Sequence, residues 1–318
     1  MSEGVSEFAL IQRFFSGLGP SNTDLRLGLG DDCAVVDVPA GTSLCLSIDT
    51  MVEGVHFLAS TPAKYVASRA LGAAVSDLAA MGATPSHFTL ALSLPSINLV
   101  WLQAFSSGLS AAADKFKISL VGGDTTQGPL AISMQVHGCV PKGAELRRSG
   151  AQSGDLLVVS GSLGDAAGAL AFLDKHEPSE QQSLLLDRYH SPQPRIELGS
   201  FLCQRASACI DISDGLLADA EHLANASSCK LNIDAEALPL SAALLACSKE
   251  GAETLALTGG DDYELLFTVS PEKFSLWMLD SSFPALTVIG SVSEGEGVEV
   301  SRQGKVFETN YKGYLHFE

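Results

Sequence analysis

The sequence has little positive charge. Its 318 residues include 19 Lys and Arg against 37 Asp and Glu, which gives a formal net charge of −18 at pH 7. Because nucleic-acid binding depends on Lys and Arg that neutralise backbone phosphates, this balance argues against a nucleic-acid partner. A small anionic substrate is still compatible, since a bound metal cation can reverse the field locally.

Long hydrophobic runs are also missing. No apolar stretch approaches the about 20 residues that a membrane-spanning helix needs. The N-terminus contains Glu3 and Glu7 and lacks the basic start of a signal peptide. We therefore expect a cytoplasmic protein without a membrane partner.

Several catalytic and ligand-binding patterns are absent. No G-x-x-x-x-G-K-[ST] segment occurs, so an ordinary P-loop is excluded. The seven cysteines include no C-x-x-C pair and are widely spaced, so we expect buried free thiols and neither disulfides nor zinc. No Ser/His/Asp or Cys/His arrangement can be recognised.

The length and the 46% apolar content predict two domains. Apolar runs alternate with helical patterns up to Arg148, which predicts an α/β domain over residues 1–148. Its expected strands are 44–48, 88–94, 118–121 and 131–140, and its expected helices are 64–81 and 98–117.

A second domain is predicted over residues 149–318. It opens with the apolar run 156–160, followed by a glycine-containing turn and an Ala-rich helix. The later strands are expected at 230–233, 264–269 and 286–289 and in a hairpin over 298–307, with helices at 215–226 and 272–279.

Short acidic segments are the most informative feature of the chain. They are nearly free of basic neighbours and are set mostly at the ends of apolar runs. The segments are 30–32, 47–50, 76–78, 122–126, 211–215 and 259–263. Oxygen-only ligands of this kind suit Mg²⁺, which binds through a few carboxylates and completes its shell with water and substrate phosphates. The pattern therefore predicts phosphoryl transfer.

Asp77 is the sharpest single signal. It lies in a helical pattern that is apolar at nearly every nearby position and has no Lys or Arg within one turn. Burying an unpaired carboxylate costs several kcal/mol, so metal ligation is favoured. The alternative is an Asp turned to solvent near the end of a helix.

Other acidic motifs have ordinary alternatives. Asp31 and Asp32 fit a hairpin turn as well as a metal site. Asp49 and Asp124 are expected just past the carboxyl ends of apolar strands, where α/β sheets place ligands. Gly123 either lets a phosphate approach the backbone closely or simply makes a turn.

Two further motifs are open in the same way. Ser213 or Asp214 can cap the following helix, and capping and ligation can coexist. His56 interrupts the chain just after Asp49, where a histidine can be a substrate ligand or merely structural. The remaining histidines form no ligand spacing.

Taken in this order, the motifs resemble those of the thiamine-monophosphate kinase family. The resemblance rests on 30–32, 48–57, 75–83, 122–126, 211–216, 261–268 and the closing 311–317, and it covers nearly the whole chain. It implies the two-domain fold of the aminoimidazole-ribotide-synthetase-like superfamily, which combines an N-terminal α/β domain that binds metal and ATP and forms dimers with a C-terminal α+β domain.

The resemblance also implies a reaction. Members of the family use ATP to phosphorylate thiamine monophosphate to thiamine diphosphate, the last step in making that cofactor, with several Mg²⁺ ions per active site and direct in-line transfer. By matching positions, the metal ligands are Asp32, Ser47, Ile48, Asp49, Asp77, Asp124, Asp211 and Asp214. Asp49, Asp77 and Asp124 are the expected catalytic residues, and Ser47 or Ile48 contributes through backbone oxygen.

The remaining matched positions concern the two substrates. Gly123, Asp124, Arg148 and Ser213 are expected to bind ATP, and His56, Asp261 and Tyr311 to bind thiamine monophosphate. This chain departs from the family at Asp261, where Glu is frequent, and at Tyr311, where Trp is frequent. We expect these differences to change substrate affinity rather than the reaction.

Two alternatives stay open at this point. One is a sister ATP-using enzyme of the superfamily, although the reactive N-terminal Cys and the terminal Cys of such enzymes are absent. The other is a non-catalytic sensor of nucleotide or thiamine phosphate, which would bind ATP without forming ADP.

Overall fold

The computed structural model describes residues 7–277 and 285–306 and divides the chain into two compact units. The first unit comprises Met1–Leu78 and Ala83–Gly143, and the second comprises Ala79–Gly82 and Ala144–Glu318. The functions predicted for the two domains are not tested by this division.

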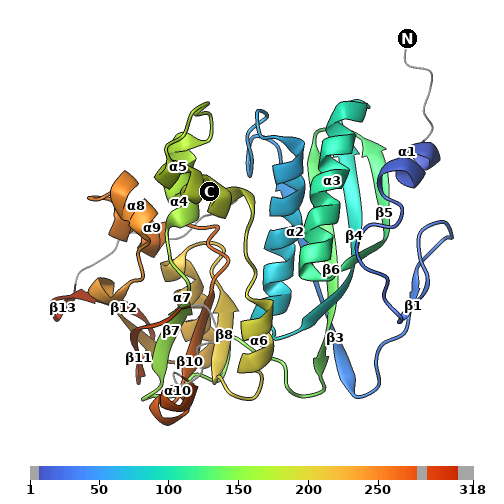
Figure 1. The fold of residues 1–318 in the computed structure, drawn as a ribbon. Coiled ribbons are helices and arrows are strands. Elements are labelled where there is room, and N and C mark those ends of the chain that lie inside the picture. The colour runs from blue at the N-terminus through green and yellow to red at the C-terminus, as the bar shows by residue number, and fades with distance from the viewer. Residues whose placement is uncertain (1–6, 278–284, 307–318) are drawn as a thin grey trace. The chain divides into compact units, whose positions relative to one another are not determined.

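The first unit contains a mixed four-stranded sheet with helices (Figure 1). Its elements are α1 (Glu7–Phe14), β1 (Leu25–Leu27), β2 (Val35–Val36), β3 (Thr42–Val52), α2 (Ala63–Ala80), β4 (Thr84–Leu94), α3 (Leu99–Phe116), β5 (Ser119–Gln127) and β6 (Ala131–Pro141). The strand order is β3-β6-β4-β5, in which only β4 and β5 are parallel. Strands β3 and β5 are therefore the two edges.

Helices α2 and α3 lie side by side (Figure 1). Helix α2 is rich in alanine and buried on most sides, as its apolar pattern predicts. A Cβ atom at Gly108 of α3 would lie 2.3 Å from the backbone oxygen of Lys64 in α2, so this close crossing requires glycine. Asn98 caps α3 by accepting hydrogen bonds from the N–H groups of Val100 and Trp101.

The second unit is α+β and contains a seven-stranded sheet of order β13-β12-β9-β11-β7-β10-β8. Its strands are β7 (Leu156–Ser160), β8 (Ala208–Asp211), β9 (Lys230–Asp234), β10 (Leu265–Val269), β11 (Leu286–Ser293), β12 (Gly297–Arg302) and β13 (Lys305–Val306). Every neighbouring pair except β9 and β12 is antiparallel. The mixed α/β and α+β fold class predicted from the sequence is confirmed.

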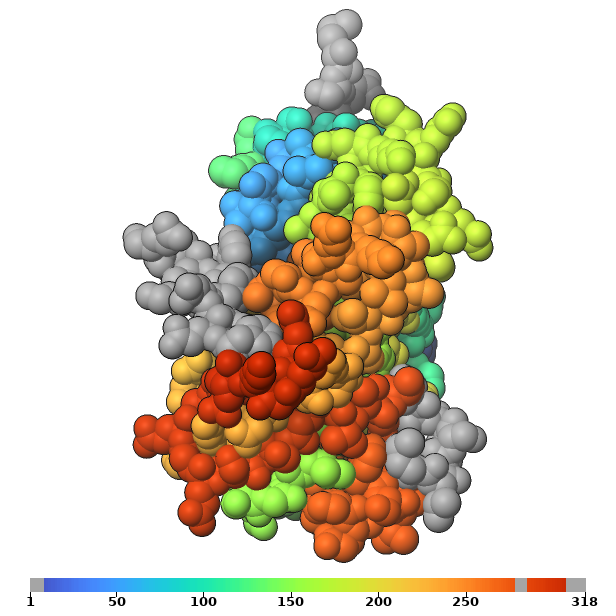
Figure 2. All heavy atoms as spheres, turned by 90° about the vertical axis from the view of Figure 1, so that its left-hand side faces the viewer, coloured from blue at the N-terminus to red at the C-terminus, as the bar shows by residue number. Residues whose placement is uncertain are grey.

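The second unit also contains helices and short 3₁₀ turns, which pack against the sheet or against one another. They are α4 (Asp165–Ala169), η1 (Leu170–Phe172), α5 (Glu180–His190), α6 (Ile196–Leu202), α7 (Leu216–Ser227), η2 (Ala235–Ala237), α8 (Ala242–Cys247), α9 (Ala252–Thr258) and α10 (Pro271–Trp277). Figure 2 shows one face of this unit, with α8 and α9 in orange beside β12 in red. Arg302 of β12 forms an ion pair with Glu253 of α9 on this face.

Two expectations from the sequence concern membrane-spanning helices and the cysteines. In residues 7–277 and 285–306, no helix has the length and apolarity needed to cross a bilayer. All seven cysteines are free, as predicted, but only Cys209 and Cys229 are buried; Cys33 is exposed and the other four are half-buried. Cys33 lies in the connection between β1 and β2, where no core covers it.

Histidines from two strands meet in the first unit. His87 of β4 lies opposite His137 of β6, and Asp24 approaches the His87 ring at 3.7 Å. Burial lowers the pKa of His87, which Asp24 opposes, and burial together with the His87 charge lowers the pKa of His137. Both rings are therefore favoured in the neutral form in the folded chain.

This pair predicts a loss of stability in acid. A histidine whose folded pKa is below its ordinary value of 6.5 binds a proton on unfolding, so its contribution is complete above pH 6.5 and decreases as the pH falls through that value. We expect the free energy of unfolding, measured by urea denaturation, to decrease between about pH 7 and pH 5. This decrease should be smaller in the double variant His87→Gln/His137→Gln than in the wild type. His222→Gln, at an exposed position of α7, is the matched control; equal pH dependence in all three proteins contradicts the prediction.

Candidate active site

Two of the predicted acidic motifs meet in the first unit. Side chains alternate between the two faces of a strand, so Ser47 and Asp49 share one face of β3. The Ser47 hydroxyl donates a hydrogen bond to the Asp77 carboxylate on α2. The structure thus brings Ser47 and Asp77 into direct contact. Asp49 lies two residues after Ser47 on the same face of β3.

Ile48 points to the opposite face of β3, where its side chain is 63% exposed. Only its backbone can act as a ligand. Because β3 is an edge strand, alternate residues direct their backbone groups away from β6. One of the neighbours Ser47 and Ile48, but not both, therefore offers an outward carbonyl oxygen, as the sequence prediction requires.

The apolar runs predicted that Asp49 and Asp124 come just after their strands. This prediction is wrong, because both residues lie within the strands. Both strands continue past their apolar segments because ladder pairing with β6 and β4 satisfies the backbone over the full length. The two residues occupy opposite edges of the sheet, separated by three strand spacings or about 14 Å. Ligands of one Mg²⁺ lie about 2.1 Å from the ion, so these two carboxylates cannot share an ion within one unit.

Gly123 has a structural reason to be glycine. A Cβ atom there would lie 2.0 Å from the carbonyl oxygen of Leu90 on β4. At the neighbouring Gly122 the nearest atom, a methyl carbon of Thr89, would be 3.6 Å away, an ordinary contact. Close pairing of β4 and β5 therefore requires glycine at position 123, whether or not ATP binds nearby.

The other predicted residues of the first unit lie in connections. Asp32 is exposed in the segment between β1 and β2. His56 follows β3, and its Nδ1 accepts a hydrogen bond of 3.0 Å from the backbone N–H of Val52. A neutral His56 with this bond carries its proton on Nε2, which is then a hydrogen-bond donor.

Acidic side chains also converge in the second unit. Asp211 ends β8, and Ser213 and Asp214 follow it. The prediction that Ser213 or Asp214 caps α7 is wrong, because Gly215 occupies that position. Instead, the Asp219 carboxylate reaches back from the first turn and accepts hydrogen bonds of 3.0 Å from the N–H groups of Ser213 and Asp214.

This arrangement places like charges close together. Burial, with the neighbouring charges of Asp211 and Asp214, raises the pKa of the Asp219 carboxyl to about 8. Asp211 and Asp219 are both buried, with exposed fractions of 4% and 3%. A cation near this cluster would relieve the repulsion.

Asp261 lies beside the same cluster. Its backbone N–H donates to the carbonyl oxygen of Ser213 at 2.9 Å, and the N–H of Tyr263 donates to that of Ile212 at 2.8 Å. The predicted substrate residue is thus held next to the predicted metal-binding segment by main-chain hydrogen bonds. Asp261 has a φ of 70°, a left-handed conformation in which Asp is better tolerated than most residues.

Two predicted substrate residues remain less defined. The Arg148 side chain is exposed, and its carbonyl oxygen accepts a hydrogen bond from the Ser227 hydroxyl. Tyr311 lies outside the described residues.

Sequence reasoning missed a buried ion pair. Glu264, fully buried at the start of β10, forms ion pairs with Arg188 of α5 and with Arg195, the residue before α6. Removing one partner of such a buried pair costs about 3–5 kcal/mol. A glutamate directly before an apolar strand was the available signal, but its partners are too distant in the sequence to be recognised.

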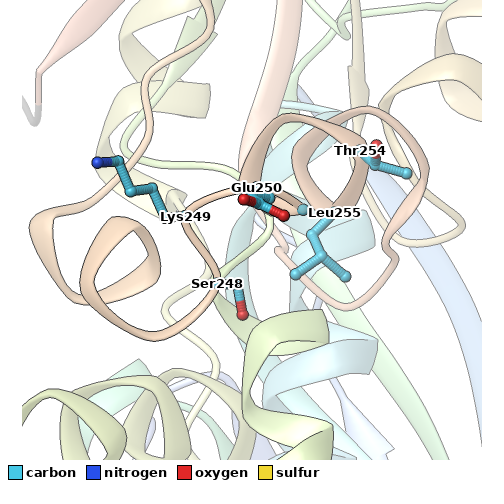
Figure 3. Close-up of a pocket in the computed structure, with 6 residues that line it drawn as sticks. Ser248, Lys249, Glu250, Thr254 and Leu255 are labelled. Atoms are coloured by element: carbon cyan, nitrogen blue, oxygen red, sulfur yellow. The ribbon is translucent and has the colours of Figure 1, made fainter.

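A pocket in the second unit lies away from the predicted site residues. A pocket of about 730 Å³ in the second unit is lined by residues of the turn between α8 and α9 and the start of α9, with Lys249 extending away from Glu250 and Leu255 (Figure 3). No predicted site residue lines that pocket. Within the described part of the chain, no three His, Cys, Asp or Glu side chains are grouped so that they could hold a metal ion.

Comparisons with known proteins agree on one family. The AIR synthase related protein N-terminal domain matches residues 30–140, and the corresponding C-terminal domain matches residues 152–303. Thiamine-monophosphate kinase of Salmonella typhimurium is 43% identical over 320 residues, covering 98% of both chains.

Solved structures give the same result. The crystal structure of thiamine-monophosphate kinase from Stenotrophomonas maltophilia superposes with a TM-score of 0.82 at 43% identity, covering 87% of this chain and 91% of that one. AaThiL complexed with AMPPCP and TMP superposes with a TM-score of 0.80 at 36% identity, covering 91% and 92%.

The neighbouring glycines of β5 provide a matched stability test. We expect Gly123→Ala to lower the free energy of unfolding by about 2 kcal/mol or more, because its Cβ overlaps the Leu90 carbonyl. Gly122→Ala, which meets only ordinary contacts, should change it by less than about 1 kcal/mol. Urea denaturation measures both, and equal losses would contradict a packing role specific to Gly123.

Proposed function

The chain belongs to the thiamine-monophosphate kinase family, and we propose that it transfers the γ-phosphoryl group of ATP to the phosphate of thiamine monophosphate. The products are thiamine diphosphate and ADP. The observation that carries this proposal is the full-length match at 43% identity to a thiamine-monophosphate kinase. A relative of the same fold, AaThiL, was solved with AMPPCP, a nonhydrolysable ATP analogue, and TMP.

The acceptor determines what the protein must do. A phosphate oxygen is already anionic at neutral pH, so the reaction needs no general base to activate it. The task is to offset repulsion between two anionic substrates and to align donor with acceptor. The chain carries a formal charge of −18, and bound cations would supply the positive charge that this task needs.

The carboxylates suit Mg²⁺ as that cation. The Asp211, Asp214 and Asp219 cluster, in which burial and the neighbouring charges of Asp211 and Asp214 raise the pKa of Asp219, provides oxygen donors. Bound Mg²⁺ would neutralise the ATP phosphates and orient them. We assign it to Asp32, Ser47 or Ile48, Asp49, Asp77, Asp124, Asp211 and Asp214, and the separation of Asp49 from Asp124 requires more than one ion.

The remaining assignments concern binding. Gly123, Arg148 and Ser213 are assigned to ATP, with Asp124 acting through its metal. His56, Asp261 and Tyr311 are assigned to thiamine monophosphate. The Nε2 proton of a neutral His56 and the carboxylate of Asp261 can contact a polar substrate directly.

We also propose a cytoplasmic homodimer that pairs through the first unit. Edge strand β3 exposes Leu44, Leu46 and Ile48 on one face, with exposed fractions of 44%, 57% and 63%. Contiguous apolar side chains of this kind on an edge strand are typical of a surface covered by a partner.

Purified protein should form thiamine diphosphate from ATP, Mg²⁺ and thiamine monophosphate, measured by chromatography. Thiamine in place of its monophosphate and EDTA in place of Mg²⁺ should both give no product, because the acceptor must be a phosphate and the metal must offset charge. ATP binding without product would contradict the proposal and favour a sensor.

In the same assay, Asp77→Asn should lower the kinase activity by more than the about 10–100-fold that is typical when a residue next to a metal ligand is replaced. Asp114→Asn, at an exposed position of α3, is the control and should leave the activity unchanged.

The dimer is tested by mass in solution. Light scattering should give twice the mass of one chain for the wild type and the mass of one chain for Leu46→Glu, because a charge placed in an apolar interface opposes association. A single-chain mass for the wild type would contradict the proposal.

A further inference from the structure

The carboxylate of Glu264 is enclosed by polar partners from three elements or their ends. Arg195 donates to both of its oxygens, once at 2.6 Å from Nε, and Arg188 adds a bond of 2.6 Å from its guanidinium. The hydroxyl of Ser160, at the end of β7, donates to it at 2.6 Å and in turn accepts the N–H of Leu265 at 3.0 Å. Glu264 is completely buried, so these bonds replace all of its water.

The charges around Glu264 are nearly balanced. Arg188 also approaches Asp165 at 3.9 Å, which gives two guanidinium groups for two carboxylates. The third acid nearby, Asp262, is buried, and this burial raises its pKa well above the ordinary value, which favours its neutral form. Loss of either arginine would leave an uncompensated negative charge in the interior.

The residues directly before Glu264 have an unfavourable backbone. Asp261 has a φ of 70° and Tyr263 a φ of 50°, and a bulky residue such as Tyr is an outlier in this left-handed region. Such conformations persist only where the surroundings fix them, and they are concentrated at functional sites. The Tyr263 hydroxyl donates to the Asp261 carboxylate at 2.9 Å, so the two strained residues support one another.

Glu264 connects this strained turn to the acidic cluster. Its carbonyl oxygen accepts the N–H of Ile212 at 2.8 Å, while Tyr263 and Asp261 donate to Ile212 and Ser213. Fixing the Glu264 side chain therefore fixes one end of the turn that carries Asp261. Ser213 and Asp214 are held separately by Asp219, so this anchor bears on Asp261 more than on the ATP-binding segment.

We propose that Arg195, together with Arg188, is a positioning residue that holds Glu264 and thereby the strained Asp261–Tyr263 turn in the conformation that presents Asp261 to thiamine monophosphate. The inference rests on the proposed function, because it takes Asp261 as a substrate contact. It adds a specific role for two arginines that are assigned to neither substrate.

The test compares the kinetic constants of Arg195→Lys with those of the wild type. Lysine keeps the charge but cannot grip both carboxylate oxygens at once. We expect the KM for thiamine monophosphate to rise at least fivefold, with the KM for ATP and kcat within twofold. Arg302→Gln, which removes an exposed ion pair of the same unit, is the matched control and should change none of the three.

A coupling measurement separates positioning from general loosening of the fold. If Arg195 acts through Asp261, Asp261→Asn and the double variant Arg195→Lys/Asp261→Asn should have the same KM for thiamine monophosphate within twofold. Multiplied effects of the two substitutions, or equal rises in KM for both substrates, would overturn the inference.

Glu264→Gln is the second variant, for use if Arg195→Lys does not fold. It should show the same selective rise in KM, and an unchanged KM would overturn the inference. The proposed function fails separately, if the wild type forms no thiamine diphosphate. In that case the affinity for thiamine monophosphate is measured by calorimetric titration. The inference then holds only if Arg195→Lys weakens this binding at least fivefold; if that variant does not fold, the same criterion applies to Glu264→Gln.

Discussion

The buried Glu264 carboxylate is the constraint on which the candidate site of the second unit depends. A charge removed from water must be compensated, and Arg188, Arg195 and Ser160 compensate it from three directions. Since Glu264 also shares main-chain bonds with Ile212, the same residue fixes the distance between the β8 and β10 ends. Folding stability and site geometry are therefore coupled, because neither can relax without exposing or unpairing the charge.

The acidic cluster shows the opposite balance. Burial, followed by the neighbouring charges of Asp211 and Asp214, raises the pKa of Asp219 to about 8. Folding alone would not favour such a grouping. Buried groups with strongly shifted pKa values cost stability and are concentrated at functional sites, so the cost indicates function more than stability.

In the first unit, the two faces of strand β3 carry different side chains. Toward α2, β3 presents Ser47, which bonds Asp77, and on the opposite face it presents apolar side chains to solvent. Alternation along a strand makes this possible, because neighbouring residues point in opposite directions. Polar side chains that bond α2 and an exposed apolar surface thus occur within a few residues of one another.

By itself, the sequence determined the longest helices and most of the sheet strands, the acidic segments and, through them, the family and its fold. These features depend on residues close together in the chain, where periodicity and short motifs carry the information. It did not determine that Asp49 and Asp124 lie within strands at opposite edges, that Gly215 rather than Ser213 precedes α7, or that Glu264 pairs with two arginines. Those depend on strand register and on contacts between distant segments, which only tertiary packing decides.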